Sequence, residues 1–196
     1  MNYANGGKLN LDGCIVVNLF GVPSAGKSTG AAYIFSKLKM AGINAELITE
    51  FAKDKVWENN AEAFKPDNQC YMFGEQFYKM SRCRDKVEVL VTDSPLPLSI
   101  LYNKSTVLGK EFNDTVMNCF NSFNNVSYLL LRDKPYNQKG RLQTEEEANA
   151  LQSPLYALLN DYNVQYTALK GNVDNYEMIV ETVIKMIKEK EKNGTD

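Results

Sequence analysis

The feature that most constrains this chain is the stretch FGVPSAGKSTG at residues 20–30, which combines glycines, a lysine and hydroxyl side chains in one turn. A continuous apolar run at residues 14–20 precedes the turn, and apolar residues at helical spacing follow it in residues 27–40. Residues 21–28 match the pattern G-x-x-x-x-G-K-[ST] at every position. The turn therefore has the strand–loop–helix context that makes this pattern specific.

The residue types in this turn suit a loop that surrounds the phosphates of a nucleotide. Backbone N–H groups reach a phosphate only where the loop curls without obstruction, which favours glycine at two positions. The following helix directs its unpaired N–H groups and its dipole toward the same phosphates. Lys27 is expected to bind the β- and γ-phosphates, Ser28 to bind Mg²⁺ and Thr29 to contact the α-phosphate. The predicted nucleotide-binding residues of the turn are Gly21, Ser24, Ala25, Gly26, Lys27, Ser28 and Thr29.

Apolar runs and helical periodicities alternate along the rest of the chain. Strands are predicted at residues 14–20, 45–49, 87–92, 126–131 and 164–169. Helices are predicted at residues 27–40, 51–59, 68–86, 98–102, 110–124, 144–159 and 175–190, and Thr144 with Glu147 forms a capping-box pattern. This alternation indicates an α/β fold with a parallel sheet covered on both faces. Residues 1–196 are interpreted as one domain with a flexible lead-in at 1–13 and a frayed tail at 191–196.

Charge and composition disfavour several classes of function. The formal net charge of −2 disfavours general DNA binding by the whole protein, and the absence of histidine excludes Ser-His-Asp hydrolysis. The four cysteines lie far apart and are interpreted as buried free thiols in a reducing compartment, so a cytoplasmic location is expected. No apolar stretch reaches the length of a membrane span, and neither a membrane partner nor a secretory signal is expected.

A magnesium site needs an acidic partner for the hydroxyl group of Ser28. The apolar run VEVLVT ends at Asp93, immediately before a turn, and a carboxylate at such a strand end suits this role. An aspartate in this position is otherwise a turn former or a helix cap. We predict Ser28 and Asp93 as metal ligands, and ATP with Mg²⁺ as the cofactors.

The segments GVPSAGKST, ELITEFAKDKVWE, QCYMFGEQ and VTDSPL occur in this order within residues 15–102. With them the chain resembles the small P-loop kinases of nucleosides and nucleotides. The similarity is greatest to nicotinamide-riboside-kinase-like and phage-encoded P-loop kinases, which include hydroxymethyluracil DNA kinase-like proteins. The resemblance implies a five-stranded parallel sheet in a three-layer P-loop fold, with the phosphate-loop strand in the centre. It also implies that the strand before Asp93 lies next to it and that an arginine-bearing lid is present.

The resemblance implies further roles on the acceptor side. In such kinases an acidic residue after the second strand faces the acceptor hydroxyl, and Glu50 occupies this position, with Asp93 as the alternative base. Gln76 is the candidate for pairing with the edge of a base, and Phe51 for stacking on the acceptor ring. Arg82, in the basic run KMSRCRDK, is the candidate for a phosphate group on the acceptor.

Each of these acceptor-side residues also has a purely structural interpretation. The charge of Glu50 also suits the N-terminus of the following helix. Gln76 also suits a boundary position in water, Phe51 a core position, and the basic run a solvated helix face.

The polar loop RDKPYNQKGRLQ at residues 132–143 is predicted to be a lid. Arg132 and Arg141 are the candidates for stabilising charge on the transferring phosphoryl group, because a guanidinium fork suits phosphate. A closed lid also excludes water from the reaction, whereas the alternative is a solvated surface loop. The resemblance places Asn172, after the last strand, where related kinases surround the adenine.

Together these features predict an ATP-dependent phosphotransferase. The γ-phosphate is expected to move to a hydroxyl of a nucleoside- or nucleotide-like acceptor, in phage-type nucleotide metabolism or modification. One alternative is a kinase of 5-hydroxymethyluracil bases within phage DNA, for which the acidic composition is unfavourable. Another is a nucleotide-dependent ATPase or regulator without transfer to a small molecule. The identity of the acceptor, the choice of base and the oligomeric state stay open at this point.

Overall fold

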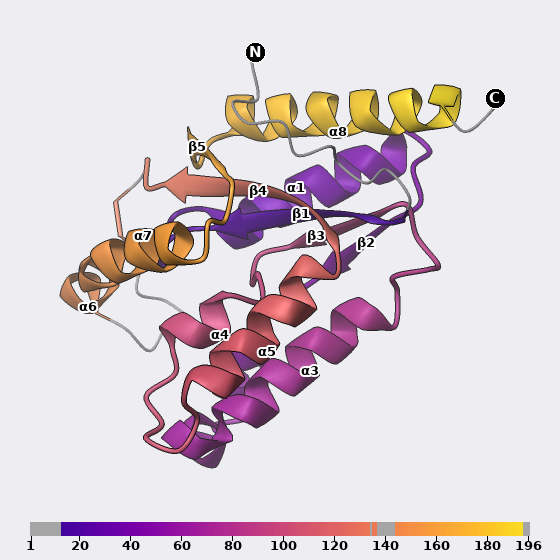
Figure 1. The fold of residues 1–196 in the computed structure, drawn as a ribbon. Coiled ribbons are helices and arrows are strands. Elements are labelled where there is room, and N and C mark those ends of the chain that lie inside the picture. The colour runs from indigo at the N-terminus through magenta and orange to yellow at the C-terminus, as the bar shows by residue number, and fades with distance from the viewer. Residues whose placement is uncertain (1–12, 134, 137–143, 194–196) are drawn as a thin grey trace.

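A computed structural model describes residues 13–133, 135–136 and 144–193 of the chain, and its strands form one parallel sheet (Figure 1). The strand order is β2–β3–β1–β4–β5, so β1 is central and β3 is its neighbour. The predicted α/β fold and the predicted places of the phosphate-loop strand and the strand before Asp93 are therefore confirmed. The strands are β1 (Ile15–Phe20), β2 (Ala45–Ile48), β3 (Val89–Thr92), β4 (Asn124–Leu131) and β5 (Thr167–Lys170).

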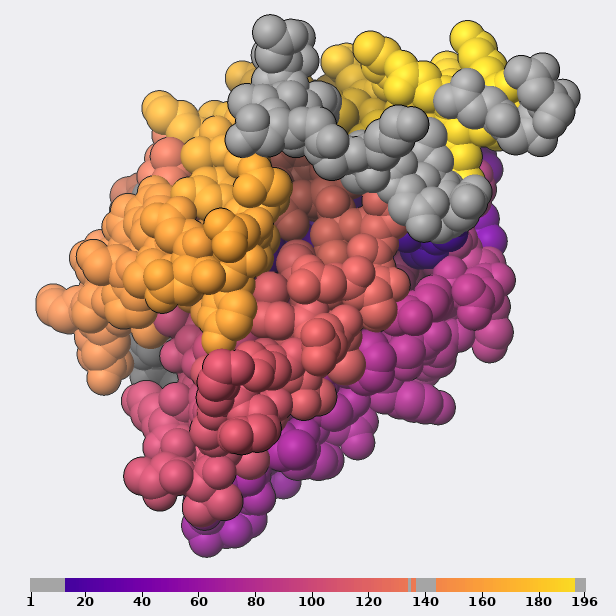
Figure 2. Space-filling model, viewed as in Figure 1, coloured from indigo at the N-terminus to yellow at the C-terminus, as the bar shows by residue number. Residues whose placement is uncertain are grey.

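Helices cover both faces of this sheet. Helices α1 and α8 lie on one face, and α3, α4, α5 and α7 lie on the other (Figure 1). Figure 2 shows α3, α5 and α7 side by side on the outer surface of the second layer. The helices are α1 (Lys27–Met40), α2 (Phe51–Trp57), α3 (Gln69–Ser81), α4 (Leu98–Leu101), α5 (Lys110–Asn121), α6 (Glu145–Ala150), α7 (Gln152–Asp161) and α8 (Val173–Asn193), with 3-10 helices η1 (Ala61–Phe64) and η2 (Pro66–Asn68).

Alternate residues of β1 belong to different hydrophobic cores. Ile15, Val17 and Leu19 pack with α1 and α8, whereas Val16 and Phe20 pack with the helices of the other face. Side chains alternate along a strand, and both faces of this sheet are covered, so β1 is apolar along nearly its whole length. The loop that follows Phe20 is thus anchored to a central strand that is buried along its whole length.

The helix predicted at residues 144–159 is divided into α6 and α7 at Leu151. Pro154 has no backbone N–H and cannot donate to the carbonyl of Ala150, which favours a break at this point. The predicted capping box of Thr144 and Glu147 at the start of α6 is confirmed.

Other boundaries shift where turns replace regular structure. Helix α3 ends at Ser81, because residues 82–86 form tight turns before β3 begins at Val89. Strand β5 begins at Thr167, three residues later than predicted, and α8 continues to Asn193 through part of the expected frayed tail. Most of the predicted lid and of the lead-in, residues 134, 137–143 and 1–12, lies outside the described residues.

The four cysteines are free, and they differ in exposure. Cys14 is buried, Cys83 and Cys119 are half-buried, and Cys70 on α3 is exposed, so the expectation of buried thiols is confirmed at Cys14 and wrong at Cys70. Within the described parts of the chain, every helix is too short or too polar to cross a membrane.

Candidate nucleotide-binding site

The loop between β1 and α1 has the curled backbone that its glycines predict. The φ angles are 147° at Gly21, 69° at Ser24 and 92° at Gly26, all in the region that favours glycine. A side chain at Gly21 would also place its Cβ 2.8 Å from the carbonyl oxygen of Leu130 on β4. The loop therefore lies against the neighbouring strand as well as following its own.

The start of α1 presents free backbone N–H groups without a competing anion. Gly26 is the N-cap, no side chain caps the helix, and no acidic residue lies in its first turn. Lys27 Nζ lies over the loop, 2.8 Å from the carbonyl oxygen of Gly21 and 3.2 Å from that of Val22. The positive end of the helix and the ammonium group thus lie next to one another, an arrangement that suits an anion.

Tyr176, near the start of α8, packs against this loop. The sequence did not reveal this contact. The Tyr176 hydroxyl donates a 3.0 Å hydrogen bond to the carbonyl of Gly26, and its ring is 2 % exposed. A Cβ atom at Gly26 would lie 2.3 Å from the hydroxyl oxygen, and one at Gly30 would lie 2.6 Å from the ring. In the sequence, Tyr176 is one member of an apolar helical stripe, and nothing in that stripe marks it as the residue next to the loop.

A cavity of about 550 Å³ extends from the loop toward α2, η1, α3 and α4. Its size falls in the range of small-molecule sites. The cavity brings together residues from segments far apart in the sequence, and the predicted site residues among its lining are Ser24, Gly26, Lys27, Ser28, Thr29, Glu50, Phe51 and Gln76.

Gln76 lines this cavity from α3 and is only 4 % exposed. Its Oε1 accepts a 2.9 Å hydrogen bond from the backbone N–H of Phe51 at the start of α2. Its Nε2 is buried and has no hydrogen-bond partner among the described residues. A buried unpaired donor costs about 1–3 kcal/mol, so a ligand that supplies an acceptor here is stabilised.

Glu50 and Asp93 meet at the carboxyl ends of β2 and β3. The backbone N–H of Glu50 donates a 3.0 Å hydrogen bond to Asp93 Oδ1, and Asp93 is 5 % exposed. Glu50 is the N-cap residue of α2, but its side chain makes no capping hydrogen bond, and it lines the cavity. Glu50 therefore lies at the N-terminus of α2, as its structural interpretation expects, and it also lines the cavity, as its proposed role requires.

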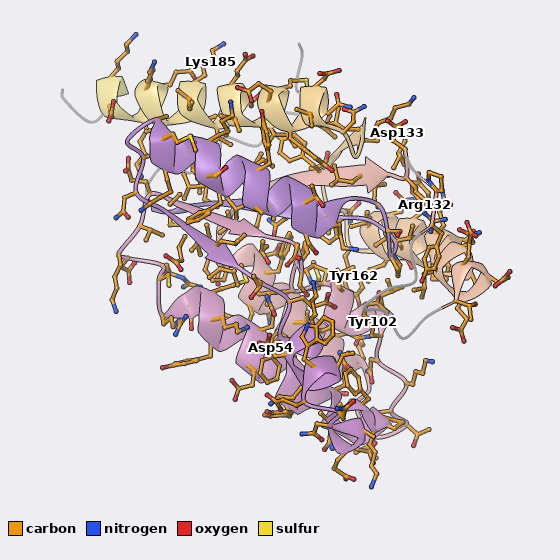
Figure 3. The ribbon with its side chains drawn as sticks, turned by 180° about the vertical axis from the view of Figure 1, so that it is seen from behind. Asp54, Tyr102, Arg132, Asp133, Tyr162 and Lys185 are labelled. Carbon is orange, nitrogen blue, oxygen red and sulfur yellow. The ribbon has the colours of Figure 1, made fainter. Side chains whose placement is uncertain are left out.

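Tyr102 lines the same cavity just after α4 (Figure 3). Burial raises the pKa of its phenol to about 12, and the negative charge of Glu50 contributes in the same direction. The phenol is therefore protonated at neutral pH and available as a hydrogen-bond donor. Sequence analysis missed it, because one tyrosine at the end of a short helix carries no distinguishing pattern.

Arg132 lies at the end of β4, beside the phosphate loop (Figure 3). Its guanidinium donates to the carbonyl oxygen of Pro23 at 3.0 Å and to Asn149 Oδ1 of α6 at 2.8 Å. It also lies 3.5 Å from a carboxylate oxygen of Glu145. Arg132 therefore connects the loop to α6, whereas Arg141 lies outside the described residues.

Asn172 occupies the turn between β5 and α8. Its Oδ1 accepts from the backbone N–H of Asn175, and its Nδ2 lies 3.3 Å from Asp133. Beside it, a Cβ atom at Gly171 would lie 2.0 Å from the carbonyl oxygen of Ala25. The side chain of Asn172 is thus engaged in local structure, while the turn itself passes against the phosphate loop.

Arg82 is separated from the other predicted site residues. It follows α3 and precedes β3, whereas the loop follows the carboxyl end of β1 in a parallel sheet. Arg82 is not among the residues that line the cavity. Arg82 therefore lies toward the amino ends of the strands, and this placement does not favour its predicted contact with the acceptor.

The donor set of the site fits a magnesium–nucleotide complex. The curled backbone, Lys27 and the uncapped start of α1 suit phosphates, and the hydroxyl of Ser28 and the carboxylate of Asp93 are ligands of the kind that Mg²⁺ prefers. Only one oxygen of Asp93 accepts the hydrogen bond from Glu50. Bound Mg²⁺ would supply charge neutralisation for the β- and γ-phosphates.

Comparison with known families agrees with this geometry. A family model described as an AAA domain matches residues 16–175, from β1 to the beginning of α8. A comparison with curated protein sequences finds no match. The P-loop NTPase part of the resemblance seen in the sequence is therefore confirmed, and its kinase branch stays a prediction. From its phosphate loop, its strand order and this match, the chain belongs to the AAA domain family, a family of P-loop NTPase type.

Proposed function

We propose that this protein is an ATP- and Mg²⁺-dependent phosphotransferase that acts on a hydroxyl of a nucleoside- or nucleotide-type acceptor. The observation that carries the proposal is the cavity, which runs from the phosphate loop to the buried, unpaired Nε2 of Gln76. A site that only hydrolyses ATP needs room for the nucleotide and a water molecule, whereas this cavity continues from the phosphate loop to α3 and α4. The proposal therefore assigns the loop end of the cavity to ATP and the α3 end to the acceptor.

The α3 end of the cavity suits a planar ring with a polar edge. Phe51, Met72 and Leu98 supply apolar surface, and Gln76 supplies one donor. Phe51 N–H already donates to the amide oxygen of Gln76, whereas Nε2 has no partner among the described residues, so Nε2 is the group that a ligand acceptor would satisfy. A nucleobase offers carbonyl oxygens or ring nitrogens that accept such a hydrogen bond.

Glu50 is the better candidate for the base. Its side chain lines the cavity, whereas Asp93 is buried behind it and accepts a hydrogen bond from the Glu50 backbone. In the proposed step, the acceptor oxygen bonds to the γ-phosphorus as the bond to the bridging oxygen of ADP breaks. The hydroxyl proton passes to Glu50, which needs only to accept it late in the reaction.

Arg132 is proposed to stabilise the charge that develops on the transferred group. Its present contact with the carbonyl of Pro23 keeps the guanidinium next to the loop. A guanidinium that contacts the equatorial oxygens in the transition state accelerates phosphoryl transfer. Its hydrogen bond to Asn149 connects this role to α6, the helix that follows the predicted lid.

The direct test follows the γ-phosphate. The full-length protein is incubated with γ-labelled ATP, Mg²⁺ and, in parallel, nucleosides, nucleotides, nicotinamide riboside and DNA that contains hydroxymethyluracil. Label on one of the small acceptors is the expected result, and it should disappear in Lys27→Ala. Label found only as free phosphate would contradict the proposal and favour a nucleotide-dependent ATPase, which the family match also accommodates.

Transfer to the DNA alone would favour the kinase of modified bases. The phage-like resemblance motivates this alternative, and the basic run KMSRCRDK would support it, but two of the four basic residues of the run are engaged within the protein. Lys79 is ion-paired with Asp54 at 3.0 Å, and Arg84 bonds to Ser122 and lies over the ring of Phe123. Small acceptors are therefore the expected substrates.

A further inference from the structure

Two lysines at the cavity differ from the other lysines around them. Lys53 of α2 and Lys104, after α4, both line the cavity and are exposed. Neither has a carboxylate partner among the described residues. Three other lysines on α2, α3 and the loop between them are ion-paired, in the pairs Lys55–Glu58 at 2.7 Å, Lys65–Glu62 at 2.7 Å and Lys79–Asp54 at 3.0 Å.

The two carboxylates that share a second hollow with Lys104 already have other partners. Lys104 also borders a smaller hollow lined by Glu62, Lys65 and Asp67. Glu62 is paired with Lys65, and Asp67 accepts a 2.5 Å hydrogen bond from the hydroxyl of Ser105. The ammonium group of Lys104 is therefore available to an anion that enters the cavity.

Lys53 is located one helical turn before Trp57 on the same face of α2, and both line the cavity. Trp57 is 66 % exposed, and it is the single tryptophan of the chain. A ligand held at Lys53 therefore changes the surroundings of the only indole. This arrangement provides a built-in fluorescence signal for the subsite.

From these observations we propose that the acceptor carries a phosphate group of its own, which Lys53 and Lys104 bind at the outer end of the cavity. The inference rests on the proposed function and narrows its substrate class from nucleosides to nucleotides. The base lies against Gln76, the accepting hydroxyl lies toward Glu50, and the phosphate lies at the two lysines. The two sites for anions, the phosphate loop and this pair of lysines, thus bind donor and acceptor separately.

Equilibrium binding tests the subsite without any need for turnover. The full-length protein is first saturated with Mg²⁺ and a non-hydrolysable ATP analogue, which occupies the phosphate loop. Nucleosides, their 5′- and 3′-monophosphates and a short single-stranded oligonucleotide are then titrated while Trp57 fluorescence is recorded. We expect at least one monophosphate to bind about tenfold more tightly than its nucleoside, because it gains charge-assisted contacts. The oligonucleotide distinguishes a free nucleotide from one within a strand.

The variants Lys53→Gln and Lys104→Gln should each reduce this preference, and the double variant should abolish it. Lys53→Arg, which keeps the charge, should retain most of it. Lys185→Gln is the matched control, because it removes the same charge from α8 on the other side of the sheet (Figure 3). Calorimetry with the same ligands checks that the fluorescence change reports binding.

Three outcomes would overturn the inference. Equal affinity for nucleoside and monophosphate would mean that no phosphate subsite exists. A preference for the monophosphate that survives in the double variant would mean that the two lysines do not form it. Weaker binding of the ATP analogue in Lys53→Gln or Lys104→Gln would assign that lysine to the donor instead. A clear monophosphate preference without label transfer to any acceptor would contradict the proposed function but leave the subsite in place, so the two failures are distinguishable.

Discussion

At the scale of single residues, hydrogen-bond partners separate the two candidate bases. Asp93 has one oxygen committed to the backbone of Glu50, whereas the Glu50 side chain faces the cavity and does not cap α2. The same carboxylate chemistry therefore has two different surroundings within one site. This difference supports the proposed roles, in which Asp93 binds Mg²⁺ and Glu50 accepts the proton.

We predict that Glu50→Gln lowers the rate of phosphoryl transfer about 10²- to 10⁴-fold while binding of Mg²⁺–ATP is kept, because the variant loses only the proton acceptor. Single-turnover rates and calorimetry with an ATP analogue measure the two properties separately. Asp93→Asn is the matched comparison and should weaken the magnesium dependence first. A slower transfer step in Asp93→Asn than in Glu50→Gln, at saturating Mg²⁺, would reverse the assignment.

The thiols provide a second test at this scale. Burial raises the pKa of Cys14 to about 12, so its thiolate is scarce in the folded protein at pH 8.5. We predict that iodoacetamide alkylates the exposed Cys70 rapidly and leaves Cys14 unmodified, with the sites identified by mass spectrometry. In denaturant, where the thiol titrates near its ordinary value, Cys14 should react as well. Rapid modification of Cys14 in the native state would contradict its burial.

At the scale of elements, α1 and α8 pack against each other around the aromatic ring of Tyr176. Tyr176 fills the space beside Gly26 and Gly30, so the start of α1 and the start of α8 pack without a gap. The position of the phosphate loop therefore depends on a helix that begins 147 residues after Gly26, the loop's last glycine. Contacts of this kind connect nucleotide binding to the packing of the whole layer.

Two helical glycines give a matched pair of substitutions. Gly30→Ala should destabilise the protein by about 1–3 kcal/mol, because its Cβ would meet the Tyr176 ring at 2.6 Å. Gly74→Ala, in an exposed position of α3 with nothing within 4 Å, should stabilise it by about 0.5–1 kcal/mol. Urea unfolding monitored by circular dichroism measures both. Similar effects of the two substitutions would mean that α8 does not pack on α1 as described.

At the scale of the whole molecule, the site lies where both helical layers meet the carboxyl end of the sheet. The phosphate loop belongs to the α1–α8 side through Tyr176, whereas Gln76 and Tyr102 come from the α3–α4 side. A ligand that contacts both sides therefore binds the folded chain and not the unfolded one. Binding should thus be visible as a gain in global stability.

We predict that Mg²⁺–ATP at about 100 times its dissociation constant stabilises the protein by about 2.7 kcal/mol, which corresponds to a rise of roughly 5–10 °C in Tm. Differential scanning fluorimetry measures the shift. Lys27→Ala should remove most of it, because the phosphates lose their ammonium partner. An unchanged Tm for the parent protein over a wide range of nucleotide concentrations would exclude the site.

Much of the architecture follows from local patterns in the chain. The apolar run before residue 21, the phosphate-loop motif and the alternation of strands and helices predict the parallel sheet and the loop geometry. These features depend on neighbouring residues, whose spacing is visible in the sequence. The break between α6 and α7 at Leu151 also has a local cause in Pro154, although the periodicity around it suggested one helix.

The set of residues that line the cavity depends on tertiary structure. Arg82 and Gln76 lie on one predicted helix, but only Gln76 lines the cavity, because α3 extends from the site toward the amino end of β3. Tyr102 and Lys104 line the cavity because α4, which immediately precedes them, packs beside α3. The sequence by itself determined that a loop suited to the phosphates of a nucleotide follows β1. Only the tertiary structure decided which residues line the cavity next to this loop. These residues come from separate segments, and the local spacing of residues in a sequence does not show which segments lie close together.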